Sequence, residues 1–178
     1  GGNIMLVTGS ALTDFEIELS LDLADTSIDV PAIGWAKLPA EPGKASMRLV
    51  LKDGAPVAIE NIDIEAGSLE GVGRAGFAAS KGNGIAVTDA SFRRLSWPGN
   101  DIGMLELSRD FDGNWLIKAE AKLIDLVPLR RNLGIGKGQP VSFDILAERI
   151  IVGDGLSLSG HISGNKKAAG GGEALFSG

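Results

Sequence analysis

Residues 102–122 read IGMLELSRDFDGNWLIKAEAK, and this stretch decides the fold. Leu105 and Leu107 alternate with polar residues before a turn, and Ile117, Ala119 and Ala121 alternate with other side chains after it. A period of two is typical of a half-buried strand, whereas a helix repeats every 3.6 residues. Because Asp-Gly between two alternating runs is a strong hairpin signal, the stretch predicts two antiparallel strands joined by a turn at 110–114.

The same alternation recurs along most of the chain. Apolar residues at 15, 17, 19, 21 and 23 face one way and polar residues between them face the other, which predicts a strand with one dry face. The alternation slips by one at Glu60 and Asn61, which predicts a β-bulge. Shorter or interrupted runs predict further strands, at 4–7, 46–52, 57–64, 69–79, 85–95, 141–145, 150–152 and 156–162.

Two segments depart from this pattern. Residues 27–30 are expected to continue the preceding strand, and 31–43, with three prolines, are expected to form a loop or an irregular edge. The leucine spacing at 123–133 predicts one short helix, followed by a flexible link to residue 140. We therefore expect residues 1–178 to be a single β-rich segment of a larger protein. Two similar meanders, at about 15–122 and 141–178, are joined by the helix and linker at 123–140.

Composition excludes several classes of function. The net charge of −6 argues against a nucleic-acid partner, which needs a basic face. The absence of cysteine excludes thiolate catalysis and sulfur-ligated metals. Aromatic residues make up only 5% of the chain, so aliphatic side chains must fill the core.

Three sequence features that could indicate a catalytic or ligand-binding site are better explained by the surrounding sequence. GVGRAG at 71–76 matches the dinucleotide-binding pattern, but alternation continues through it, which indicates strand glycines. DFDGN at 110–114 resembles a calcium loop, but the closing acidic position falls on Ala121. His161 is the single histidine and takes a polar position on its strand, where a solvated side chain is expected. We predict no catalytic residue, no metal site and no cofactor, and therefore no enzyme.

The remaining signal is an excess of aliphatic side chains on the predicted sheet faces. They require either a closed sandwich or barrel core, or an open curved sheet with one apolar face. The residues alone favour the closed core, because large exposed apolar patches are rare in soluble proteins. The candidates for lining a groove, should the sheet be open, are Phe15, Ile17, Leu19, Leu21, Met47, Leu49, Leu51, Leu105, Leu107, Trp115, Ile117, Phe143, Ile145, Leu156 and Leu158.

A series of short segments resembles a known family. They are ADTSIDV at 24–30, PAIGWAK at 31–37, Asp53-Gly54, the glycine-bearing strand to Gly76, 92–101, FDGNW at 111–115 and LIDLVPL at 123–129. In this order, over about residues 15–165, they resemble the AsmA-like envelope proteins of Gram-negative bacteria, the group related to YhdP and TamB. The chain departs from that pattern at Arg130-Arg131, where the family is more often small or apolar.

The resemblance implies a mainly β fold: an elongated, curved antiparallel sheet, as a half-open groove or a flattened barrel or sandwich, with at most one short helix. It implies a non-catalytic periplasmic segment of a protein anchored in the inner membrane. Its apolar groove would carry phospholipids between the inner and outer membranes. The expected partners are phospholipid acyl chains and neighbouring repeats of the same polypeptide, with no nucleic acid and membrane contact only through other parts of the protein. The alternative is a β-sandwich structural or protein-interaction module.

Overall fold

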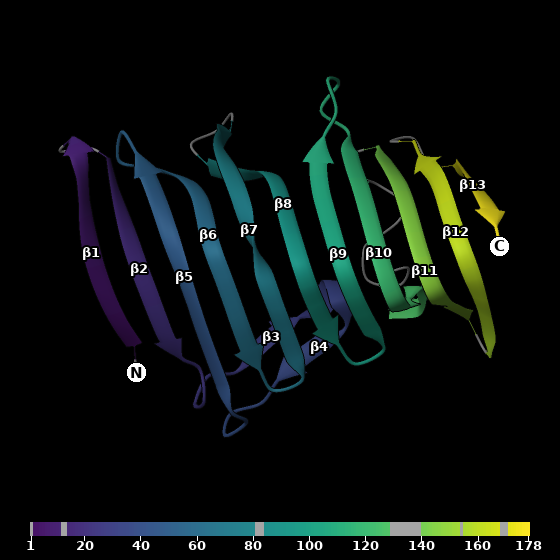
Figure 1. The fold of residues 1–178 in the computed structure, drawn as a ribbon, viewed down its shortest axis with the longest axis horizontal. Helices are drawn as coiled ribbons and strands as arrows, with labels where there is room; N and C mark the ends of the chain where they lie inside the picture. The colour runs from purple at the N-terminus through teal and green to yellow at the C-terminus, as the bar shows by residue number, and fades with distance from the viewer. Residues whose placement is uncertain (1, 12–13, 81–83, 129–139, 154, 168–170) are drawn as a thin grey trace.

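Eleven of the strands form one open sheet in the computed structural model, which describes residues 2–11, 14–80, 84–128, 140–153, 155–167 and 171–178 (Figure 1). The sheet order is β1-β2-β5-β6-β7-β8-β9-β10-β11-β12-β13, and β3 and β4 form a separate two-stranded sheet. The strands are β1 (Gly2–Ala11), β2 (Asp14–Asp22), β3 (Ile28–Val30), β4 (Trp35–Lys37), β5 (Gly43–Lys52), β6 (Ala55–Ala66), β7 (Leu69–Ser80), β8 (Gly84–Trp97), β9 (Asn100–Arg109), β10 (Trp115–Asp125), β11 (Val141–Gly153), β12 (Leu156–Lys166) and β13 (Gly172–Ser177).

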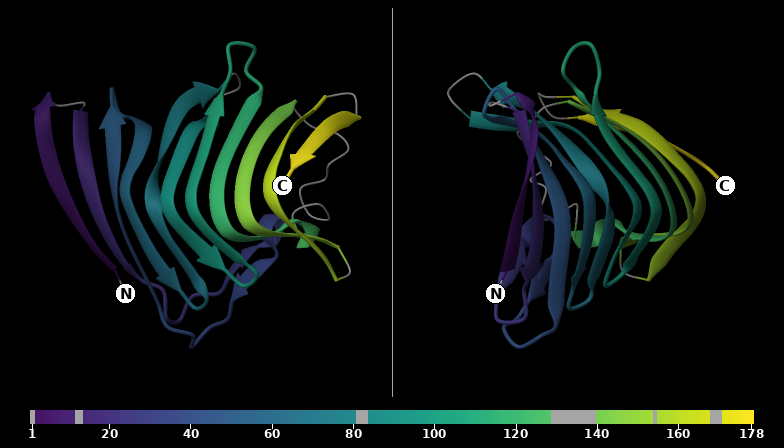
Figure 2. Two further views of the ribbon diagram at one scale, coloured as in Figure 1. Left: turned by 45° about the vertical axis from the view of Figure 1, so that its right-hand side comes forward. Right: turned by 60° about the vertical axis from the view of Figure 1, so that its left-hand side comes forward.

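This architecture confirms the mainly β fold and decides between its forms. The two outermost strands, β1 and β13, do not pair with each other, so the sheet is not a barrel. The only other sheet among the described residues is the two-stranded β3–β4 pair, which is too small to be the second half of a sandwich. Figure 2 shows the sheet bent into an open arch. The closed core that the residues alone favoured is therefore wrong, because the strands never turn back to cover their own apolar face.

The hairpin predicted at 102–122 is confirmed as β9 and β10, with Leu107 directly opposite Ile117. The predicted bulge is also confirmed. The pairing of β6 with β7 shifts register between Ile59 and Ile62, and Asn61 takes a positive φ of 51°. This extra residue returns the apolar side chains of β6 to one face of the sheet, since a slip of one residue would otherwise point them to the other face.

One strand pair breaks the antiparallel pattern. β10 and β11 run parallel, with Trp115 opposite Val141 and Ile124 opposite Ile150. A parallel pair needs a long crossover connection instead of a tight turn. Within the predicted helix, residues 126–128 are helical, residues 123–125 belong to β10 instead, and 129–133 lie outside the described residues.

The expectations for residues 27–43 were partly wrong, although residues 38–42 form a loop as expected. Residues 28–30 are β3 and do not extend β2, and a 3₁₀ turn, η1 (Pro31–Ile33), connects them to β4. Pro31 fits the first position of that turn because its fixed φ suits a helical start. Gly34 ends the turn with a φ of 66°, a left-handed conformation that glycine adopts without strain. We call β3, η1 and β4 together the cap.

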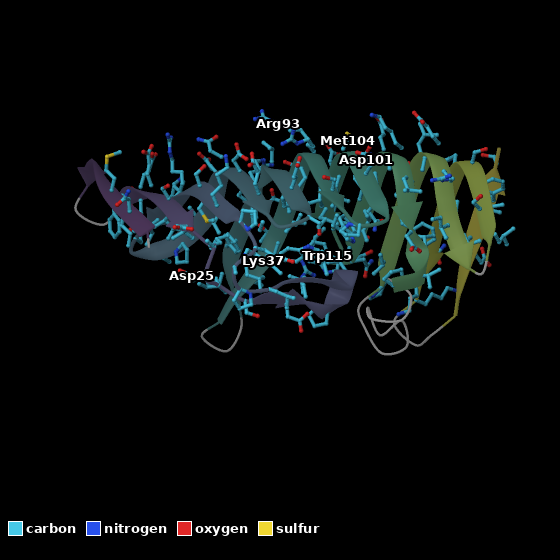
Figure 3. All side chains as sticks on the ribbon, turned by 90° about the horizontal axis from the view of Figure 1, so that it is seen from below. Asp25, Lys37, Arg93, Asp101, Met104 and Trp115 are labelled. Carbon is cyan, nitrogen blue, oxygen red and sulfur yellow. The ribbon has the colours of Figure 1, made fainter. Side chains whose placement is uncertain are left out.

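The cap covers one end of one sheet face. Trp35 of the cap is buried in a cluster with Trp97, Ile102, Ile124 and Ile150 of the large sheet. Ile28, Val30 and Ile33 pack against the same cluster. We call the covered face the inner face and the opposite one the outer face. Figure 3 shows Lys37 and Trp115 on the inner side, and Arg93, Asp101 and Met104 on the outer side.

Candidate functional site

The inner face carries a continuous row of apolar residues that crosses all the strands of the large sheet. Directly paired residues on neighbouring strands point to the same face, so a row can be followed from one pair to the next. The first row begins at the register position of Leu6 and continues through Ile17, Leu49, Ile59, Ala75, Ala90, Leu107, Ile117, Phe143, Gly164 and Ala174.

Two further rows run beside the first, each two residues nearer the cap. The second row is Ile4, Leu19, Met47, Ile62, Gly73, Phe92, Leu105, Ala119, Ile145, Ile162 and Phe176, with one break in pairing at the bulge between Met47 and Ile62. The third row is Gly2, Leu21, Ala45, Ile64, Gly71, Leu95, Ile102, Ala121, Ala147 and Gly160. Strands lie about 4.8 Å apart, so a row across the sheet is about 48 Å long.

Burial divides these rows by their distance from the cap. In the third row Ala45, Ile102 and Ala147 are buried, and Ile102 and Ala147 belong to the cluster around Trp35 of the cap. In the first row Leu107, Ile117 and Phe143 are only half-buried. The cap therefore uses the third row as a core. In the first row Ala90 is buried, whereas Leu107, Ile117 and Phe143 stay partly accessible.

The outer face is polar. Among the described residues, six ion pairs lie on it: Lys44–Glu65, Arg48–Glu16, Arg48–Glu18, Arg74–Asp89, Arg94–Glu70 and Lys122–Asp101. Each joins neighbouring strands and is largely exposed, so its contribution to stability is small. The His161 side chain is 41% exposed, as expected for a solvated histidine, and it also contacts Asp144 on this face. Most charges of the described sheet thus lie on the outer face, and the apolar rows lie on the inner face.

The predicted groove residues occupy the rows as follows. Ile17, Leu49, Leu107, Ile117 and Phe143 are in the first row; Leu19, Met47, Leu105 and Ile145 in the second; and Leu21 in the third. Phe15 pairs with Leu51, and Trp115 pairs with Val141, on the side of the first row away from the cap. Leu158 pairs with the buried Ile150 beyond the third row, and Leu156 pairs with Gly153 at the end of the sheet, where it is exposed.

Several row members were not among the predicted residues. Ile59, Phe92, Leu95 and Ile162 lie in the rows, but bulges or a glycine-rich neighbourhood interrupt the alternation around them. Following the alternation through the bulge at Asn61, with the slip of one residue removed, would have placed Ile59 and Ile62 on one face. Gly73 sits opposite Phe92, and a side chain at this position would collide with the Phe92 ring.

The polar groups near the rows serve the structure. Lys37 is 1% exposed, and its ammonium donates hydrogen bonds to the carbonyl oxygens of Ala24, Thr26 and Leu38 at 3.1–3.2 Å. In the β9–β10 turn, hydrogen bonds from the side chain and the backbone of Asn114 hold the pKa of Asp110 below its usual value. Over the described ranges, no group of three or more histidine, aspartate or glutamate side chains is arranged to hold a metal ion.

None of the described helical residues forms a helix long and apolar enough to cross a membrane. No family model, no curated protein and no solved structure matches this chain. The geometry and chemistry of the inner face therefore carry the functional argument.

Proposed function

We propose that the inner face binds the acyl chains of lipids and lets them move along its apolar rows. The observation that carries this proposal is the first row, which crosses eleven strands as apolar or glycine residues and is only half-buried where Leu107, Ile117 and Phe143 lie. Contiguous apolar surface of this extent marks an interaction or ligand site.

Acyl chains suit this surface because the free energy of binding is spread over many apolar contacts and requires no catalytic group. Each buried methylene contributes about 0.8 kcal/mol, wherever along a row it lies. A uniform row of aliphatic residues offers similar environments at successive strands, so a bound chain meets no single deep site that would hold it in place. Binding is therefore compatible with movement along the rows.

The cellular role in this proposal follows the resemblance to AsmA-like envelope proteins. The chain would be a non-catalytic periplasmic segment of a protein anchored in the inner membrane, and its lipids would be phospholipids passing between the inner and outer membranes. The open apolar face supports this role, because a lipid crossing an aqueous compartment needs its acyl chains shielded while its headgroup stays in water.

Native mass spectrometry of the chain, purified from a bacterial host and again after loading with phospholipid, tests the proposal. Ile117→Lys places a charge in the first row, whereas Leu116→Lys places the same charge on the outer face of the same strand, where Leu116 pairs with Ser108 and Ser142. We expect bound lipid in the wild type and in Leu116→Lys, and its loss in Ile117→Lys. Circular dichroism of all three proteins verifies the fold, and Ile117→Ser is a milder variant if Ile117→Lys does not fold. Absence of lipid from the wild type, or equal loss in the two lysine variants, would contradict the proposal.

A second candidate function is strand-to-strand recognition of another protein at the sheet edge. It rests on β1, whose ten residues GNIMLVTGSA include no charged residue and no proline. Exposed edge strands usually carry such residues because an unprotected edge pairs with other chains. Edge recognition predicts concentration-dependent association without any need for lipid, which sedimentation velocity detects.

A further inference from the structure

The only charged side chains on the described part of the rows and their open margin are cationic. A fourth line of paired residues runs along the side of the first row away from the cap and consists of Arg109, Trp115, Val141 and Lys166. We call it the rim row. It lies two residues along β9–β12 from Leu107, Ile117, Phe143 and Gly164, so it shares the inner face and is about 7 Å from the first row.

The rim row has a fixed cationic group at one end. The guanidinium of Arg109 lies 4.1 Å from the centre of the Trp115 ring and donates a hydrogen bond of 2.8 Å to the carbonyl oxygen of Gly113. The stacking and the hydrogen bond restrain the guanidinium beside the ring. Trp115 itself joins an apolar body to a polar N–H, as tryptophan does at the boundary between hydrocarbon and water.

Lys166 supplies a second cation three strands further along, at a Cα separation of about 14 Å from Arg109. No aspartate or glutamate occupies the three rows or the rim row among the residues that the structure describes. Acidic residues of β2, β6, β7 and β9 instead alternate onto the outer face, as the ion pairs there show. The rim row thus carries two cations and no carboxylate, while Asp110 and Asp112 lie in the turn next to Arg109 and the whole chain has a net charge of −6.

We propose that the inner face selects lipids with an anionic headgroup, a phosphate or a carboxylate, which Arg109 and Lys166 contact in succession while the acyl chain lies along the first row. This inference rests on the proposed function, and it adds the class of lipid. The rim row lies about 7 Å from the first row. A lipid whose charged headgroup is attached directly to its acyl chains could therefore contact both rows at once. A headgroup without net negative charge gains nothing comparable at this margin.

The test compares lipids of equal acyl composition. The purified chain is loaded with equimolar phosphatidylglycerol and phosphatidylcholine carrying oleoyl chains, at physiological salt so that long-range repulsion is screened, and the bound lipids are counted by native mass spectrometry. A second comparison, between oleate and methyl oleate, tests whether a carboxylate alone is enough for preferential binding. We expect the wild type to prefer the anionic member, and Lys166→Gln and Arg109→Gln each to reduce that preference by about fivefold. Lys122→Gln, which removes a cation from the outer face, is the matched control and should leave the preference unchanged.

Each outcome has a definite meaning. Preference for phosphatidylglycerol over phosphatidylcholine, without preference for oleate over methyl oleate, restricts recognition to phospholipid headgroups of net negative charge. Preference for both anionic members shows that a carboxylate is recognised as well. Equal binding of the two phospholipids by the wild type, or an equal loss of preference in Lys122→Gln, overturns the inference while leaving acyl-chain binding intact. Failure of every lipid to bind instead contradicts the proposed function itself. Arg109→Lys, which keeps the charge, separates loss of charge from loss of packing against Trp115.

Discussion

The ammonium of Lys37 lies 3.1 Å from the carbonyl oxygen of Thr26, and this contact ties the cap to the loop that follows β2. The same Nζ also donates to Ala24 and Leu38, so a single buried cation is hydrogen-bonded to three backbone carbonyls. Its methylenes pass close to Gly43, where a Cβ would lie 2.8 Å from Cε of Lys37. Lys37 thus holds together the segment that follows β2 and the segment that leads into β5, on either side of the cap.

Replacing Lys37 with methionine should destabilise the cap. Methionine fills a similar volume but donates no hydrogen bond, and two of the three carbonyls keep a backbone partner, from Ala40 and Glu41. We therefore expect a loss of about 1–3 kcal/mol in the free energy of unfolding, measured by urea denaturation. Lys44→Met, at an exposed side chain paired only with Glu65 among the described ion pairs, is the control and should change stability little. Equal stability of the two variants would mean that the three hydrogen bonds contribute nothing.

Gly73 should not tolerate alanine. An added Cβ would lie 2.9 Å from Cγ of Phe92 and would also meet the carbonyl oxygen of Ser91, so β8 would have to shift. We expect Gly73→Ala to cost about 1–3 kcal/mol in the free energy of unfolding, as overpacking does. Gly103→Ala on β9 is the matched change, because its Cβ would lie 3.6 Å from the nearest atom, the carbonyl oxygen of Glu120. A result in which Gly103→Ala is the more damaging change would refute the proposed close packing at Phe92.

The β9–β10 turn should weaken in acid through Asp110. Its carboxylate accepts hydrogen bonds from the N–H groups of Asp112 and Asn114 and from the Asn114 side chain, at 2.8–2.9 Å, and the Asn114 bonds in particular lower its pKa from the ordinary 3.8. A group with a lowered pKa in the folded state stabilises that state above its unfolded pKa, and this contribution is lost as the pH falls through the lower, folded value. Wild type should therefore exceed Asp110→Ala in stability by a constant amount above pH of about 5. The difference should shrink below pH 3.8.

Denaturation at a series of pH values measures this difference. Asp112→Ala removes a carboxylate from the same turn without removing the acceptor of these three bonds, and it serves as the control. A difference between wild type and Asp110→Ala that grows on acidification would have the wrong sign and would exclude this explanation.

The edge at β1 should respond to a single added charge. Ile4 is 74% exposed on an edge strand without charged residues, so strand addition there meets no electrostatic barrier. If the chain associates in sedimentation velocity, we expect Ile4→Lys to shift it toward the monomer. Leu146→Lys introduces the same charge at an exposed leucine of β11, which pairs with Glu120 on one side and His161 on the other, and should leave association unchanged. Association that is insensitive to both changes would place the contact elsewhere.

Pairing between strands that are adjacent in sequence could be predicted, because alternation and turn residues lie within the paired segments themselves. Alternation of apolar and polar residues on both sides of Asp112-Gly113 predicts the β9–β10 hairpin. A one-residue slip in that alternation predicts the bulge at Asn61. For the same reason Ile17, Leu107 and Ile117 could be assigned to one face before their neighbours were known.

Other features depend on contacts between distant segments. Nothing in the alternation of β10 indicates that Trp115 pairs in parallel with Val141, since the crossover between them sets that direction. The strands of the cap have only three residues each, too few to show a period. Pro31 follows the end of a strand, as expected, but the sequence did not show that it also begins a 3₁₀ turn. Phe92 could not be placed because its position depends on the space that Gly73 leaves.

The rows reach both edges of the sheet with apolar residues, because the second row ends at Ile4 on β1 and at Phe176 on β13, which is 47% exposed. Any strand that joined either edge in register would prolong this surface by about 4.8 Å without altering its cross-section. The length of the apolar rows is therefore set by the number of strands in the sheet. Inserting or deleting a whole hairpin would change that length by about 10 Å and leave the apolar character of the rows unchanged.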